Sequence, residues 1–330
     1  MNTIIENVKV SSIAVAMPKN QLDLESLKSV YGENEVVRIM ESTGVKKVRV
    51  AEKHIKTSDL CYAAANHLMV TNQIAPLSID AIVLVTQTSD GVMPATSVRL
   101  QDRLGLSTHV VAMDINYGCS GYIYGLYVSS LLIASGGCKK VLLCAGDVIT
   151  QLINPNDRSV RMVFGDAGSA TLVENGKDNI AFSIKTDGSG KEFLKTIQND
   201  DNKPEILMDG AAVMNFALRD VPFVIEQLLG VKGWSSDEVG VYALHQANSF
   251  MLNYLRKKMK INKNNLPIEI ENTGNTGSAS IPLLLTLKQK FLQREGMLFK
   301  SVLCGFGVGL SCAAAALNLS NTKMLAPIEI

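Results

Sequence analysis

The stretch MDINYGCSGYIYGLYVSSLLIASGG, residues 113–137, decides the fold class. A β-type segment over residues 110–115 leads into Cys119, and a long run of small and aromatic residues follows, closed by Gly136-Gly137. The pattern predicts a strand, then the cysteine, then a buried helix. Unpaired N–H groups and the dipole at a helix N-terminus favour a thiolate and lower its pKa. Cys119 is therefore a candidate nucleophile, and a buried structural cysteine is the competing interpretation.

Composition narrows the class of protein. The chain has 330 residues, 47% hydrophobic and 5% aromatic, which suits layered α/β packing in two halves. The net charge of +1 gives no global attraction for nucleic acid or an anionic membrane. We expect no membrane span, no signal peptide and a reducing cytoplasmic location. The six cysteines have no CxxC spacing, so zinc sites and disulfides are not expected: Cys61, Cys119, Cys138, Cys144, Cys304 and Cys312.

The chain is organised as two copies of one alternating strand and helix pattern, which predicts largely parallel sheets. The first copy has strands expected from Ala81, over residues 110–115 and over residues 140–147. The second has them over residues 239–245, 267–270 and 301–318.

We place the halves at 1–178 and 179–330, packed as one body without a linker. The most loop-like stretch is NDDNKPEILMDG, residues 199–210.

The repeat makes a geometric prediction about three polar residues. Cys119 follows the strand that ends at Ile115, and Asn275 follows the matching segment that ends at Ile270. His245 ends the strand VYALH, at a strand-to-helix junction where α/β proteins concentrate their ligand sites. The three should converge, as a Cys-His-Asn site requires.

Several candidates also have simpler interpretations. His245 could be a structural histidine, and Asn275 in ENTGNTGSAS could be an ordinary turn residue. Arg158 could be a solvated charge or could grip a ligand phosphate or adenine. The basic run at 256–265 could be a solvated helix face or could dock an acidic carrier protein. GFGVGL at 305–310 could be a tight turn or could supply an oxyanion-hole N–H.

Four ordered motifs carry a resemblance that covers nearly the whole chain. DINYGCSGYIYGL, LHQAN, GNTGSASIP and GFGVGLS resemble the ketoacyl-ACP synthase III family of the thiolase superfamily. This resemblance implies an α/β, thiolase-like five-layered αβαβα fold with two pseudo-symmetric halves, and a homodimer. It also implies a condensing enzyme with a catalytic triad of Cys119, His245 and Asn275. The oxyanion hole would use the backbone N–H groups of Cys119 and Val308, where the family usually has glycine at the latter position.

The resemblance also implies a set of substrate contacts. Arg158 matches a CoA-contacting arginine, and Met93 would project into the acyl pocket of a partner subunit. The pantetheine channel would include Phe164, Met208, Gly210, Ala247 and Asn248.

Other positions depart from the family pattern. A tryptophan and an arginine that sandwich the CoA adenine are replaced by Arg38 and Ser42. An arginine after HQAN is Phe250, and a basic helix residue is Asn215. These changes favour a specialised relative over a housekeeping initiator that uses acetyl-CoA.

The expected activity is acylation of Cys119 from an acyl-CoA or acyl-ACP, followed by decarboxylative Claisen condensation with malonyl-ACP. No metal or redox cofactor is expected.

One alternative is an acyltransferase of the same fold that passes the acyl group to an alcohol or amine. A hydroxymethylglutaryl-CoA-type synthase would need a catalytic glutamate, for which no motif is present. A non-catalytic chain-length subunit would typically lack the nucleophile. A redox or metal-binding role rests on the cysteine count alone.

Overall fold

The structure is a computed structural model and describes residues 1–200 and 202–330. Within these residues a ten-stranded sheet has the order β10-β11-β12-β7-β6-β4-β5, with β1 paired to β7, β13 and β14. Its strands are β1 (Asn2–Met17), β4 (Ala81–Val85), β5 (Val111–Ile115), β6 (Lys140–Asp147), β7 (Ala167–Thr186), β10 (Val241–Leu244), β11 (Ser301–Gly307), β12 (Ser311–Leu317), β13 (Lys323–Met324) and β14 (Ile328–Glu329).

The described chain also contains two two-stranded sheets, nine α-helices and seven short 3-10 helices. One small sheet pairs β2 (Gln21–Asp23) with β3 (Lys47–Arg49), and the other pairs β8 (Leu194–Gln198) with β9 (Pro204–Met208). The helices are α1 (Lys28–Tyr31), α2 (Glu33–Thr43), α3 (Thr57–Thr71), α4 (Thr96–Arg103), α5 (Gly121–Ala134), α6 (Arg158–Arg161), α7 (Gly210–Lys232), α8 (Ser249–Lys258) and α9 (Ser280–Arg294).

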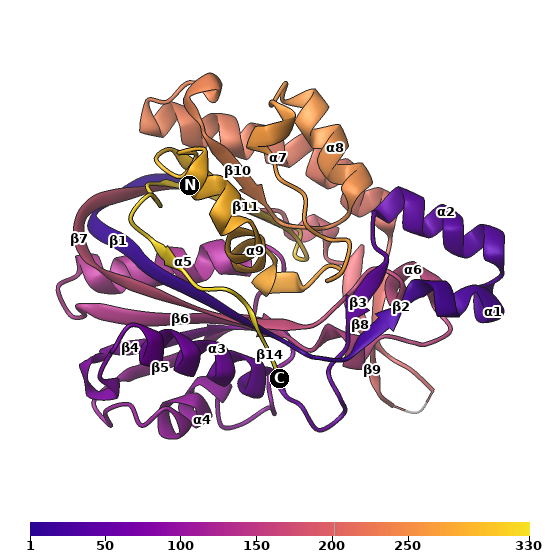
Figure 1. Cartoon of the computed structure of the whole chain (residues 1–330), viewed down its shortest axis with the longest axis horizontal. Helices are drawn as coiled ribbons and strands as arrows, with labels where there is room; N and C mark the ends of the chain where they lie inside the picture. The colour runs from indigo at the N-terminus through magenta and orange to yellow at the C-terminus, as the bar shows by residue number, and fades with distance from the viewer. Residues whose placement is uncertain (201) are drawn as a thin grey trace.

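The elements stack in five layers, as predicted (Figure 1). Helices α3 and α4 cover the outer face of the strands β4, β5 and β6, and α7 covers the outer face of β11 and β12. Between the two groups of strands lie α5 and α9, which contact strands on both sides. A helix enclosed on both sides is expected to be apolar all round, and this explains why α5 is largely apolar and carries no charged residue.

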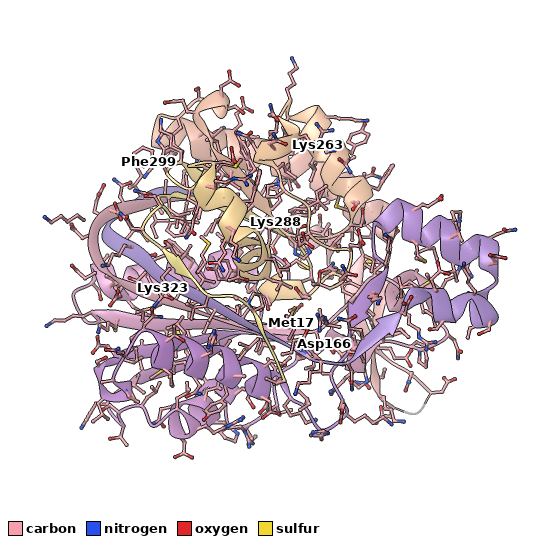
Figure 2. The ribbon with its side chains drawn as sticks, in the orientation of Figure 1. Met17, Asp166, Lys263, Lys288, Phe299 and Lys323 are labelled. Atoms are coloured by element: carbon pink, nitrogen blue, oxygen red, sulfur yellow. The ribbon has the colours of Figure 1, made fainter. Side chains whose placement is uncertain are left out.

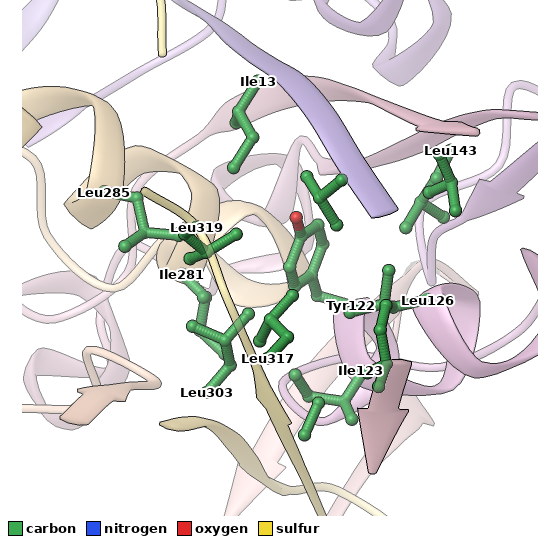
Figure 3. Packing of buried hydrophobic residues seen from close by; sticks show 14 of the residues in the cluster. Ile13, Tyr122, Ile123, Leu126, Leu143, Ile281, Leu285, Leu303, Leu317 and Leu319 are labelled. Carbon is green, nitrogen blue, oxygen red and sulfur yellow. The ribbon is translucent and has the colours of Figure 1, made fainter. Parts of the chain in front are cut away.

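The middle layer holds a core cluster that joins the two halves (Figure 3). Tyr122 of α5 is 1% exposed and lies amid aliphatic side chains from both groups of strands. Its hydroxyl is paired with Thr171 Oγ1 at 3.0 Å, which satisfies its one polar atom. Burial of each large side chain in this layer contributes roughly 1.5–3 kcal/mol to stability. The Cys119 helix is therefore fixed by packing from both halves.

Strands β1 and β7 run through both halves. β1 pairs with β7 from Asn2↔Ser183 to Ala16↔Gly168, and β7 pairs with β6 at one end and β12 at the other. A division of the chain at 178/179 falls inside β7. The two proposed halves therefore share a continuous ladder, and the boundary itself stays a prediction.

Two local expectations were wrong. Residues 267–270 form no strand, because the N–H of Glu269 binds Gln246 Oε1 at 2.9 Å and not a neighbouring strand. The stretch 199–210 is not simply a loop, because Pro204–Met208 form β9 and pair with β8. Asp201, within that stretch, lies outside the described residues.

The loops at the carboxyl ends of the strands are tied together by a buried carboxylate. Asp166 precedes β7 and lies beside the two-stranded sheet of β2 and β3 (Figure 2). It accepts hydrogen bonds from the N–H groups of Ala51 at 2.8 Å and Thr150 at 2.9 Å. Burial raises its pKa to about 6.

Among the described residues, no helix combines the length and apolar character that crossing a membrane requires.

Candidate active site

Cys119 lies between the end of β5 and the start of α5 and is 9% exposed. Strand β11 crosses directly over it. A Cβ at Gly305 would lie 2.6 Å from the Cys119 carbonyl oxygen, and one at Gly307 would lie 3.0 Å from Cys119 Sγ. Only glycine permits this approach, so the glycines of β11 shape the space around the thiol. The next residue, Ser120, is held by Ser311 at an Oγ–Oγ distance of 2.6 Å.

The electrostatic setting of the thiol differs from the prediction. Burial, and to a smaller extent the nearby carboxylate of Asp147, raise the pKa of Cys119 to about 12. Hydrogen bonds from the backbone N–H groups of Val308 and Cys119 act in the opposite direction. The expected lowering of the pKa was therefore wrong, because desolvation outweighs the two amides. Both N–H groups point at the sulfur.

His245 follows β10 and is 1% exposed. Its backbone N–H donates to Cys304 O at 2.8 Å, which extends the β10–β11 ladder by one residue. Its Nδ1 is 2.6 Å from Ser280 Oγ, at the start of α9, and its ring packs edge-on against Phe306. Burial lowers the pKa of His245 to about 3, so the ring is neutral at pH 7. When the Ser280 hydroxyl donates to Nδ1, Nε2 carries the proton.

Asn275 is 5% exposed and is fixed through its backbone and its side chain. Its N–H donates to Val163 O at 2.8 Å, and its carbonyl accepts from the N–H of Gly165 at 3.0 Å. Its Oδ1 accepts from the N–H of Gly277 at 3.0 Å. The amide oxygen is therefore occupied, and the Nδ2 group remains as the donor of this side chain.

Asp147, at the end of β6, connects the two sides of the site and was not identified from the sequence. One oxygen accepts from the Gln87 N–H at 2.8 Å and from the hydroxyls of Thr86 at 3.1 Å and Thr88 at 3.2 Å. The other accepts from Ser278 Oγ at 2.7 Å. In the part of the chain that the structure describes, no lysine or arginine forms an ion pair with it. Burial raises its pKa.

A cavity of about 400 Å³, here called the large cavity, leads to the three residues. Cys119, His245 and Asn275 all line it, together with Phe306 and Gly307. Six predicted substrate-binding residues also line it: Arg158, Phe164, Met208, Gly210, Ala247 and Asn248. The structure thus brings these residues from six separate segments of the chain to one cavity.

Family models and known proteins match this chain in sequence. Residues 113–188 match the model for 3-oxoacyl-[acyl-carrier-protein] synthase III, and residues 229–319 match the model for its C-terminal part. A Lactococcus lactis beta-ketoacyl-[acyl-carrier-protein] synthase III is 33% identical over 94% of this chain and 99% of its own. The chain belongs to the 3-oxoacyl-ACP synthase III family.

Solved structures agree with this assignment. A 3-oxoacyl-(acyl-carrier protein) synthase from Burkholderia xenovorans LB400 superposes with a TM-score of 0.95 at 33% identity, covering 100% of this chain and 99% of that one. The priming β-ketosynthase of the R1128 polyketide pathway has a TM-score of 0.86 at 26% identity, covering 95% and 97% of the two chains. The thiolase fold expected from the motifs is confirmed.

The mouth of the large cavity in this synthase III chain is built from charged side chains. Glu35 Oε1 accepts from Arg38 Nη2 and Arg158 Nε, both at 2.7 Å. The hydrogen bond from Arg38, followed by that from Arg158, holds the pKa of Glu35 below its usual value. Ser42 also lines the cavity. Glu35, which the sequence did not single out, therefore partly neutralises the two arginines.

Other predicted positions lie away from the large cavity. Met93 is 81% exposed and Phe250 is 60% exposed, and Asn215 lies on the exposed side of α7. Val308 lines a second cavity of about 200 Å³, here called the small cavity. Cys119 lines both cavities, so the thiol lies where the two meet.

Proposed function

We propose that this chain is a condensing enzyme that joins an acyl group to a malonyl-derived unit through an acyl-Cys119 intermediate. The proposal rests on one observation: Cys119, His245 and Asn275 line the same inner part of the large cavity, here called its floor. A thiol contacted by two backbone N–H groups, a neutral imidazole and an amide with a free Nδ2 group line one buried space. Family membership supplies the substrate class, an acyl-CoA or acyl-ACP donor and malonyl-ACP.

In the first half-reaction, Cys119 Sγ attacks the thioester carbonyl of the donor. The N–H groups of Cys119 and Val308 stabilise the oxyanion of the tetrahedral intermediate. Collapse releases the donor thiolate, which takes up the proton that the Cys119 thiol gives up. The products are acyl-Cys119 and a free thiol. Because burial keeps the resting thiol protonated, deprotonation accompanies attack and does not precede substrate binding.

In the second half-reaction, malonyl-ACP enters through the large cavity and loses CO₂. The electron pair of the breaking bond forms an enolate, whose oxygen accepts hydrogen bonds from His245 Nε2 and Asn275 Nδ2. The enolate carbon then attacks the acyl-Cys119 carbonyl. A 3-oxoacyl thioester forms, and the released Cys119 thiolate takes up one proton. His245 acts throughout as a neutral donor, which agrees with its lowered pKa.

The quaternary state and partners form part of the proposal. β5 ends the sheet order and so presents an edge strand, and Val92 is 98% exposed beside Met93. An exposed edge and exposed apolar residues support a homodimer in which Met93 reaches the partner. We also propose acyl carrier protein as a partner, a cytoplasmic location and a reaction without metal or redox cofactor.

The test is intact-protein mass spectrometry after mixing with a panel of acyl-CoAs and acyl-ACPs, followed by malonyl-ACP. An acyl adduct should form, disappear on addition of malonyl-ACP and yield CO₂. Cys119→Ala should abolish the adduct, and Cys144→Ala, which removes another buried cysteine, should not. An adduct that survives malonyl-ACP but is released by an alcohol or amine would instead establish the acyltransferase. No adduct from any donor would refute the proposal.

A further inference from the structure

The small cavity is lined by both apolar side chains and neutral amides. Apolar side chains line one part of it, among them Ile149 and Leu152. The amides of Gln87 and Asn116 line another part. Among the described residues, neither amide side chain makes a hydrogen bond to the protein. Both can therefore bind a ligand, and an amide offers a donor and an acceptor together.

Gln87 is held in place next to the nucleophile. Its backbone N–H is bound to the buried Asp147 at 2.8 Å. Its side chain lies across Gly118, the residue before Cys119, since a Cβ there would lie only 2.4 Å from Gln87 Oε1. Any larger residue at position 118 would displace this amide. The Gln87 side chain thus lies close to the path of an acyl group bound to Cys119.

The charge of the cavity narrows the choice of ligand group. Among the described residues that line the small cavity, the one cation is Lys195, and it is paired with Glu192 at 2.5 Å. A carboxylate would therefore find no free counter-charge, whereas a neutral hydroxyl matches a neutral amide. A volume of about 200 Å³ suits a short acyl chain.

We infer that the preferred acyl donor of this enzyme carries a hydroxyl group on a short chain, recognised by the Gln87 amide. The inference rests on the proposed function, because it assigns the acyl group that Cys119 accepts. A polar site discriminates against the analogue that lacks the hydroxyl, because binding that analogue leaves the amide unpaired. An apolar pocket rejects an added hydroxyl much less strongly. Since Gln87 is exposed to solvent in the single chain, a preference of about tenfold is expected.

The experiment compares rates of Cys119 acylation by 3-hydroxybutyryl-CoA, 4-hydroxybutyryl-CoA, butyryl-CoA and succinyl-CoA, followed by intact mass. At least one hydroxyacyl donor should react about tenfold faster than butyryl-CoA. In Gln87→Leu this ratio should fall to about one. Alkylation of Cys119 by iodoacetamide reports whether the variant retains its folded site, and Gln73→Leu on the surface is the matched control.

Three results would overturn the inference. Butyryl-CoA could react as fast as both hydroxyacyl donors in the unmodified enzyme, a result that does not depend on any variant. Succinyl-CoA could react fastest, or Gln87→Leu could keep the original ratio. Each of these leaves the proposed function intact, since an adduct still forms. Failure of every donor to form an adduct would instead remove the proposed function and the inference with it.

Discussion

The floor and the mouth of the large cavity are built in different ways. At the floor, Cys119, His245 and Asn275 are at most 9% exposed, and backbone hydrogen bonds and close packing hold them. At the mouth, the side chains of Arg38 and Arg158 are 70% and 56% exposed and are held by one carboxylate. Exposed ion pairs contribute little energy and rearrange easily. The comparison indicates that the three residues at the floor are held rigidly, whereas the charged side chains at the mouth can rearrange.

The sharpest way to break this comparison is to remove a donor at the floor. Asn275→Ala deletes the Nδ2 group and should lower CO₂ release from malonyl-ACP by about 10²- to 10³-fold, the usual loss for one oxyanion donor. The rate is measured with carboxyl-labelled malonyl-ACP. Asn262→Ala, which removes only the cap of a short surface turn, should retain the original rate. An unchanged rate in Asn275→Ala would show that the amide has no part in decarboxylation.

Asp147→Asn tests whether the buried carboxylate acts on the thiol. A negative charge disfavours a neighbouring thiolate, so its removal should lower the pKa of Cys119. The rate of Cys119 alkylation by iodoacetamide at pH 8 should rise about three- to tenfold, while condensation falls because the Ser278 turn loses an anchor.

The control for that variant is Asp166→Asn, a second buried carboxylate that also binds backbone N–H groups.

In the unmodified enzyme, alkylation should increase about tenfold per pH unit from pH 7 to 10 without a plateau, because the thiol pKa is about 12. A plateau below pH 9 would show that the thiol is activated in the resting state.

Ser280→Ala should have a smaller effect. It removes the hydroxyl 2.6 Å from His245 Nδ1 and so loosens the orientation and tautomer of the ring. CO₂ release should fall about tenfold, and acyl-adduct formation should fall less. The surface variant Ser320→Ala serves as the control. Equal loss in both half-reactions would indicate that Ser280 supports the fold and not the imidazole.

At the mouth, Glu35→Gln should produce the smallest change. Without the carboxylate, Arg38 and Arg158 are free to contact an anionic donor, so KM for acyl-CoA should fall about threefold at low salt. The difference should vanish in 0.5 M NaCl, because salt screens exposed charges. Glu33→Gln, on the same helix but paired with Lys28, is the matched control. A KM that rises would mean that Glu35 orders the arginines productively.

The sequence predicted the floor better than its surroundings. Cys119, His245 and Asn275 lie in short motifs just after apolar segments, and such positions meet at one edge of an α/β sheet. The pKa of Cys119 could not be predicted, because its burial comes from the backbone of β11, almost two hundred residues away in the chain.

Two supporting residues could not be found for similar reasons. Asp147 is recognisable as a charge at the end of the apolar strand KVLLCAGD, but its hydrogen-bond partners come from two distant segments, residues 86–88 and Ser278. Ser280 looked like a turn residue in GNTGSAS, and only tertiary packing places it against His245. The strand expected at 267–270 failed because a side-chain amide, Gln246, takes the hydrogen bond that a ladder would supply.

In the proposed mechanism, Cys119 accepts the acyl group and His245 assists decarboxylation. The most direct test of these separate roles is to measure both half-reactions on one preparation of His245→Ala. Acyl-adduct formation on Cys119 is followed by intact mass, and CO₂ release by labelled malonyl-ACP. CO₂ release should fall by about 10²- to 10³-fold, because the enolate loses a donor, while adduct formation falls by less than about tenfold. Equal losses in the two half-reactions, or a larger loss in adduct formation, would contradict the account.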